Sequence, residues 1–182
     1  MGRDKYSEYK ILYEKYLNQM FSYGKALGVE DDTLYDLIHD VFLHLFEHSN
    51  EVGKSGQQKF YLLRCLKNRI IQNRRQVSVL NLTMEETELP FTLVISDIGN
   101  LEEEEERKEI ACQIEKMMQC LTNHQREAIY LRFMQELEYD EIADILKLTP
   151  KGTRKLIYRA IERIRDKYGP GMICFLFYNH FL

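Results

Sequence analysis

The sequence predicts an all-α protein made of two small helical domains joined by an acidic linker, the C-terminal domain being a helix-turn-helix. Glycine and proline are scarce, at 9 and 3 among 182 residues, which disfavours a sheet-rich fold with many turns. Apolar residues recur at helical spacing over long stretches, and charge is divided into segments of opposite sign. With 45% hydrophobic and 30% charged residues, the chain has the composition of a folded globular protein.

The net charge of −4 conceals a strong segregation along the chain. Residues 1–80 carry 12 basic and 10 acidic side chains, residues 81–110 carry 2 and 10, and residues 111–182 carry 11 and 9. This pattern predicts a domain at 1–80, an acidic linker at 81–106, a second domain at 107–169 and an apolar tail at 170–182. Five consecutive glutamates lie at 102–106. Exposure to solvent at the start of a helix is a sufficient explanation for this acidic run.

Several classes of protein are disfavoured by the sequence. The four cysteines, at positions 65, 112, 120 and 174, form no C-x-x-C pair, and the polar N-terminus does not look like a signal peptide, so a reducing, cytoplasmic setting is expected. No apolar run reaches the roughly 20 residues of a membrane span, so no membrane insertion is expected. His44 and His48 are too few for a metal site, and no phosphate-binding loop is present. We therefore expect no cofactor, no metal and no enzymatic activity.

The first amphipathic helix runs from about Leu34 to Phe46 and turns one apolar face inward. Its opposite face collects Asp36, His39, Asp40 and Leu43. An acidic strip with an exposed leucine suits a protein partner better than a nucleic acid, although ordinary solvent exposure explains it equally well.

A second amphipathic helix begins near Lys59 after a polar break. Its outer face combines an aromatic ring, cations and amides without a carboxylate. The residues are Tyr61, Arg64, Asn68, Gln72 and Arg75. This combination is typical of a surface for single-stranded or partly melted DNA.

The second domain contains two helices at helix-turn-helix spacing. A helix at 107–119 is followed by one capped by Thr122, then by a helix over Tyr139–Leu146 and a turn at Lys147 and Leu148. Thr149 then caps the last helix, with Pro150 as its first residue. Because the second helix of this motif enters the major groove, its outer residues are predicted to bind DNA. They are Lys151, Arg154, Lys155, Tyr158 and Arg159.

These segments resemble the extracytoplasmic-function (ECF) sigma factors of bacterial RNA polymerase. LTNHQREAIYLRF, YDEIADIL and YRAIERIR are similar to sigma region 4, and DLIHDVFLHLF with YLLRCLKNRII to region 2. The departures include Thr153 where valine usually packs, and Glu136 and Lys147 where glycine is frequent. Lys147 would occupy a left-handed turn position with mild strain.

The resemblance implies a function for each surface. The region of Asp36, His39, Asp40, Phe42 and Leu43 would dock on the clamp helices of the polymerase core. The Tyr61 face and the loop at 54–58 would handle the melted minus-ten element, where a flipped base could be captured. The helix from Lys151 to Arg159 would read the minus-thirty-five element as duplex DNA.

The function expected is that of a sigma factor which binds RNA polymerase core and directs promoter recognition, melting and transcription initiation. Its expected partners are the core, promoter DNA and an anti-sigma factor, and the free chain is expected to be monomeric. The alternatives are a stand-alone helix-turn-helix transcription regulator and a helical adapter that binds only proteins. The tail, in which 9 of the 11 residues after Gly171 are apolar, would dock on a domain or on an anti-sigma factor, or add packing to the last helix.

Overall fold

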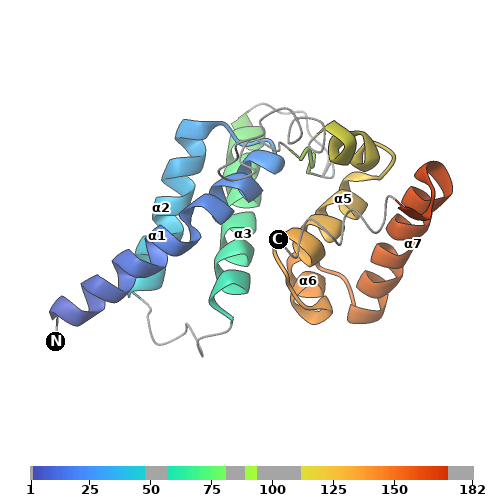
Figure 1. The fold of residues 1–182 in the computed structure, drawn as a ribbon. Helices are drawn as coiled ribbons and strands as arrows, with labels where there is room; N and C mark the ends of the chain where they lie inside the picture. Colours follow the sequence, from blue (N-terminus) through green and yellow to red (C-terminus); the bar gives the residue numbers. More distant parts are fainter. Residues whose placement is uncertain (1, 48–56, 81–88, 94–111, 172–182) are drawn as a thin grey trace. The chain divides into compact units, whose positions relative to one another are not determined.

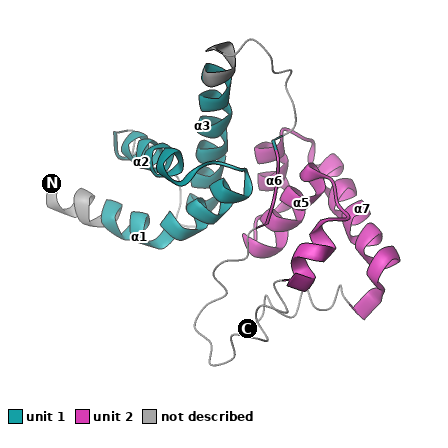
Figure 2. Cartoon of the chain, turned by 90° about the horizontal axis from the view of Figure 1, so that it is seen from above, with its two compact units in different colours: residues 1–89 teal, residues 90–182 magenta. Residues whose placement is uncertain are grey.

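The computed structural model describes residues 2–47, 57–80, 89–93 and 112–171, and these residues are helical or irregular without a strand. The chain forms two compact units, residues 1–89 and 90–182 (Figure 2). Within the described residues, no helix combines the length and apolar character needed to cross a membrane.

The first unit consists of α1 (Gly2–Ala26), α2 (Asp31–Glu47) and α3 (Gln58–Leu80), each packed against the other two (Figure 1). α2 buries the stripe predicted from its spacing, including Leu34, Ile38 and Phe42. Gly24 of α1 lies where Leu34 of α2 would collide with any Cβ, so its missing side chain permits the close approach of the two helices.

Arg74 of α3 closes the end of α1. Its Nη2 donates hydrogen bonds to the carbonyl oxygens of Leu27 at 2.6 Å and Gly28 at 3.3 Å. A cation at a helix C-terminus satisfies carbonyl groups that the helix leaves unpaired. Partial burial lowers the pKa of the Arg74 guanidinium from its ordinary value. Arg74, which lies on the same helix as the predicted DNA-binding face, therefore stabilises the first unit.

The second unit contains a helix at 112–118, α5 (Asn123–Ile129), the π-helical turn η1 (Tyr130–Met134), α6 (Tyr139–Leu146) and α7 (Pro150–Tyr168). α5, α6 and α7 pack together (Figure 1). Thr122 caps α5 as predicted, because its hydroxyl accepts from the Gln125 N–H while the Gln125 side chain accepts from the Thr122 N–H. The hydroxyl of Tyr168 donates to the carbonyl of Lys116 at 2.8 Å, tying the end of α7 to the helix at 112–118.

Residues 90–93, predicted as part of the linker, belong to the second unit, and we call them the strap. Phe91 and Leu93 are buried, and the Phe91 ring lies 5.4 Å from that of Tyr130. The main chain of Phe91 is held on both sides, its N–H by Asn123 at 3.2 Å and its carbonyl by Arg126 at 2.8 Å. Phe91 and Leu93, two apolar residues of the predicted linker, therefore pack into a core that is built from residues later in the chain. The glutamates at 102–106 lie outside the described residues.

Candidate nucleic-acid interface

The predicted helix boundaries, cap and turn of the helix-turn-helix are confirmed. α6 spans Tyr139–Leu146, and Thr149 caps α7 by accepting a 3.0 Å hydrogen bond from the Gly152 N–H, with Pro150 as the first helical residue. Lys147 has φ 55°, the left-handed conformation expected at this turn. The N–H of Leu148 then donates to the carbonyl of Ala143 at 2.8 Å, which ends α6.

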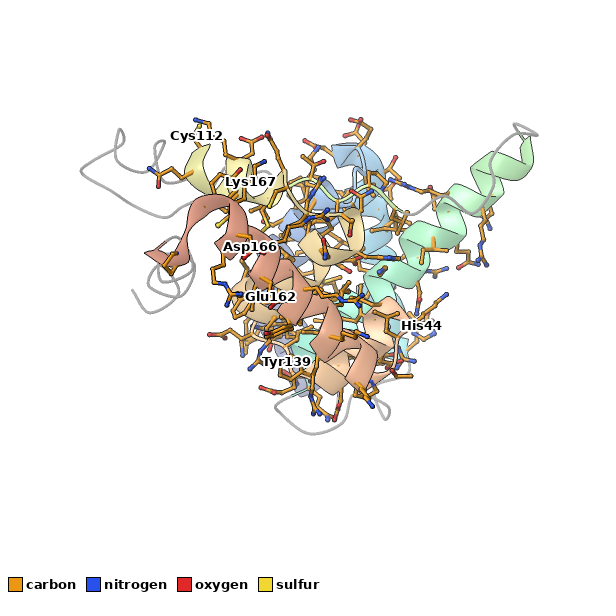
Figure 3. All side chains as sticks on the ribbon, turned by 90° about the vertical axis from the view of Figure 1, so that its right-hand side faces the viewer. His44, Cys112, Tyr139, Glu162, Asp166 and Lys167 are labelled. Atoms are coloured by element: carbon orange, nitrogen blue, oxygen red, sulfur yellow. The ribbon has the colours of Figure 1, made fainter. Side chains whose placement is uncertain are left out.

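All five predicted DNA-binding residues of α7 are exposed. They recur every three or four positions and therefore share one face: Lys151, Arg154, Lys155, Tyr158 and Arg159. The hydroxyl of Tyr158 is hydrogen-bonded to Glu162, which raises the pKa of Tyr158. Glu162, Asp166 and Lys167 continue along the same helix (Figure 3). Four cations and an aromatic ring on the first half of this face suit a nucleic acid.

The opposite side of α7 packs against the rest of the second unit. Thr153, Ile157, Ala160 and Ile164 are buried, while Ile161 is half-buried. Thr153 is fully buried, and among the described residues its hydroxyl has no hydrogen-bond partner. The departure from valine at this position therefore leaves a polar atom unsatisfied under the recognition helix.

The contact between Arg154 and Tyr139 is not predictable from the sequence. The guanidinium carbon of Arg154 lies 5.4 Å from the ring centre of Tyr139, the first residue of α6 (labelled in Figure 3). Arg132 lies 4.9 Å from the same ring centre. No periodicity within one helix predicts this cluster, because its members come from three separate segments.

The predicted face of α3 is also present. Arg64, Asn68, Gln72 and Arg75 are exposed, and Tyr61 is half-buried. Arg64 lies 6.0 Å from the ring of Phe60, and Gln72 accepts a 3.5 Å hydrogen bond from Arg69. Burial raises the pKa of the Cys65 thiol on the same helix, which keeps this cysteine protonated. The face thus combines ring, cations and amides as expected.

On α2, Asp36, His39, Asp40 and Leu43 are exposed, and Leu43 retains 44% of its accessible surface. Tyr35, which the sequence reasoning did not include, is 50% exposed at the start of the same strip. Arg69 of α3 lies 3.8 Å from the Asp40 carboxylate. The strip is therefore apolar at both ends and acidic between them.

Phe42 requires a correction. The resemblance assigned it to the polymerase contact, but it is fully buried. Its ring lies 4.9 Å from that of Tyr13 and 5.8 Å from that of Tyr9, both on α1. The helical spacing of α2 turns Phe42 inward with Ile38 and Leu45. Phe42 therefore belongs to the core beneath the exposed strip and contributes nothing to its surface.

Other predicted features fall wholly or largely outside the described residues. They are most of the loop at 54–58, all of the linker except 89–93, and the tail after Gly171. Within the described part of the chain, no group of three or more histidine, cysteine, aspartate or glutamate side chains could hold a metal ion.

A family match covers most of the second unit, and a known protein aligns along most of the chain. Residues 111–164 match the family described as Sigma-70, region 4. The chain is 21% identical over 165 residues to the ECF RNA polymerase sigma factor SigM of Bacillus subtilis, covering 88% of this chain and 95% of the relative.

Among solved structures, the fold is similar to that of a complex of the sigma factor RpoE with the anti-sigma factor NepR from Bartonella quintana. The TM-score is 0.60 at 18% identity, with coverage of 87% of this chain and 95% of the other. This likeness concerns the fold. The region 4 match and the alignment along most of the chain confirm the resemblance of this chain to the extracytoplasmic-function sigma factors that was found in the sequence.

Proposed function

We infer that this protein acts through three surfaces, one for the polymerase core and two for promoter DNA. As an ECF sigma factor it directs promoter recognition and transcription initiation by RNA polymerase. The observation that carries the assignment of surfaces is the exposed basic face of α7, the capped second helix of the helix-turn-helix. The family consists of sigma factors, which are not enzymes, and we assign no catalytic step to this chain.

The face of α7 is assigned to the minus-thirty-five element as duplex DNA. In a helix-turn-helix the recognition helix presents its N-terminal residues to base edges in the major groove. Lys151, Arg154 and Lys155 lie in the first two turns, while Tyr158 and Arg159 follow one turn later. The nearer residues are therefore expected to specify bases, and Arg159 to contact phosphate or the flanking base pair.

The face of α3 is assigned to the melted minus-ten element. Tyr61 offers a ring for stacking, Arg64 and Arg75 offer cations for phosphates, and Asn68 and Gln72 offer amides for base edges. Melting of the promoter requires a surface that prefers separated strands, and exposed planar side chains provide that preference.

The exposed strip of α2 is assigned to the clamp helices of the polymerase core. It consists of Asp36, His39, Asp40 and Leu43, with Tyr35 added and Phe42 removed. We assign residues 1–80 to region 2 and residues 107–169, together with the strap, to region 4. The protein would act in the cytoplasm as a monomer when free, with an anti-sigma factor as a further partner.

Run-off transcription tests this function. Fragmented host DNA is transcribed by purified core polymerase with and without the protein. Transcripts that appear only with the protein, and that share paired upstream elements, are the expected result. If core and DNA support transcription with another sigma factor but none with this one, the stand-alone regulator becomes the better explanation.

Two variants of α7 test the duplex assignment within that assay. Lys155→Ala or Arg159→Ala is expected to weaken promoter binding by about 1–3 kcal/mol for each base that the removed side chain recognised. Lys167→Ala is the matched control, since it removes an exposed cation from the far end of the same helix. Equal effects of Lys155→Ala and Lys167→Ala would indicate general electrostatic attraction without base recognition.

A further inference from the structure

One aromatic ring in the second unit lies close to two arginine side chains. Tyr139, the first residue of α6, is half-buried. The guanidinium carbons of Arg132 and Arg154 lie 4.9 Å and 5.4 Å from its ring centre. Both distances are within the range of a cation–π attraction, in which a cation is drawn to the face of an aromatic ring.

The two arginines differ in what else holds them. Arg132 donates to the carbonyl of Leu137 at 2.7 Å and to the Glu138 carboxylate at 3.1 Å. Its charge is therefore already matched by an acid. Arg154 is exposed, and among the residues that the structure describes no carboxylate lies within ion-pair distance of it. Arg154 is thus the member of the cluster that remains available to an external partner.

The ring restricts where the Arg154 guanidinium is found. An exposed arginine loses much side-chain freedom when it is fixed on a base, and this loss weakens binding. A side chain that already rests on a ring before binding loses less. The second turn of α7 also places Arg154 where recognition-helix residues reach base edges.

We propose that Tyr139 is a positioning residue for promoter recognition, which holds Arg154 ready for one base pair of the duplex element. The base chosen is expected to be guanine, whose O6 and N7 accept the paired hydrogen bonds of a guanidinium. The proposal rests on the proposed function, because it requires α7 to lie in the major groove. It adds Tyr139 of α6 as a residue that influences specificity through Arg154 of α7 and touches no DNA itself.

The test uses the full chain bound to core polymerase and a duplex library randomised across the upstream element. Retained DNA is sequenced for wild type, Arg154→Ala, Tyr139→Leu, Tyr139→Phe and the double variant Tyr139→Leu/Arg154→Ala. Arg154→Ala is expected to reduce the preference at one base-pair position by about tenfold or more. Tyr139→Leu is expected to reduce the preference at that same position by about two- to fivefold.

Two further outcomes separate positioning from packing. Tyr139→Phe keeps an aromatic face and is expected to retain the wild-type preference. In the Arg154→Ala background, Tyr139→Leu is expected to cause no additional loss. Tyr168→Leu serves as the matched control, because Tyr168 is a half-buried tyrosine of the same unit that hydrogen-bonds Lys116. It is expected to lower the thermal unfolding midpoint without changing any base preference.

The outcomes distinguish this proposal from the function on which it rests. If Arg154→Ala alters no base preference, the positioning proposal is wrong, whereas the placement of α7 in the groove is decided separately by the Lys155→Ala variant described above. If Arg154→Ala acts but Tyr139→Leu does not, only the positioning role is wrong. A loss with Tyr139→Leu that is spread evenly over all positions, or that persists undiminished without Arg154, would likewise show that Tyr139 serves the fold alone.

Discussion

The guanidinium of Arg126 donates a 2.8 Å hydrogen bond to the main-chain carbonyl of Phe91, 35 residues earlier in the chain. The same side chain donates through Nε to the carbonyl of Leu121 at 3.1 Å. Arg126 therefore joins the strap to the segment before α5. Residues late and early in the second unit are thus held together by one side chain.

Phe91→Ala is expected to destabilise the second unit by about 3–5 kcal/mol, the usual cost of deleting a buried phenyl ring. Phe91 is 1% exposed and packs against Tyr130, so its removal leaves a cavity beside η1. Hydrogen exchange on the full chain should show weaker protection in α5 and α7, with α2 unchanged. Thr92→Ala, at an exposed position of the strap, is the control. Unchanged protection in the Phe91 variant would show that the strap adds no stability.

Thr153→Val is expected to increase the free energy of unfolding of the second unit by about 1 kcal/mol. The substitution keeps the branched shape and removes a buried hydroxyl that has no partner among the described residues. Thr149→Ala provides the opposite case, since it removes the cap of α7 and should cost about 1 kcal/mol. Urea unfolding of the two variants and wild type measures both effects. A less stable Thr153→Val variant would mean that the hydroxyl is satisfied in solution.

Asp40→Ala is expected to weaken binding to core polymerase about tenfold, or about 1.4 kcal/mol. The free energy of unfolding should change little, because the ion pair of Asp40 with Arg69 is 3.8 Å long and largely exposed. Arg69→Gln separates the two roles, since it breaks the ion pair but keeps the carboxylate. It should retain core affinity in a fluorescence binding assay. Normal affinity of the Asp40 variant would contradict the clamp assignment.

The stability of the second unit is expected to fall as pH rises from 10 to 12. Burial raises the pKa of Tyr130 to about 12, opposed in part by its hydrogen bond from Gln135. The unfolded chain ionises this phenol near pH 10, so the folded state binds more protons between these values. The contribution is complete below pH 10 and is lost as pH approaches 12, at about 2–3 kcal/mol.

A comparison of wild type with Tyr130→Phe isolates this effect from the other titrating groups. Unfolding free energies are measured by urea at pH 8 and at pH 11.5. Wild type should lose more stability over this interval than the variant does. A parallel decline in the two proteins would show that Tyr130 ionises in the folded state as readily as in the unfolded one.

Much of the helix-turn-helix could be predicted because its signals are local. A cap at Thr149, a proline after it and a left-handed residue at Lys147 involve neighbours in the chain, and the structure contains all three. The burial of α2 was equally predictable from its spacing. Phe42 illustrates the point, since the periodicity turned it inward while the resemblance assigned it to a surface, and the periodicity was right.

By itself, the sequence determined α2, α3, α6 and α7, the caps at Thr122 and Thr149, and which face of each of these helices is charged, because these depend on residues one to four positions apart. Tertiary structure alone decided which side chains from different segments meet. Examples are Arg154 on the ring of Tyr139, Arg69 beside Asp40, and Phe91 bound by Arg126. Such pairings depend on how helices are rotated and docked, and that is set by the packing of a whole core, which no short stretch of sequence encodes.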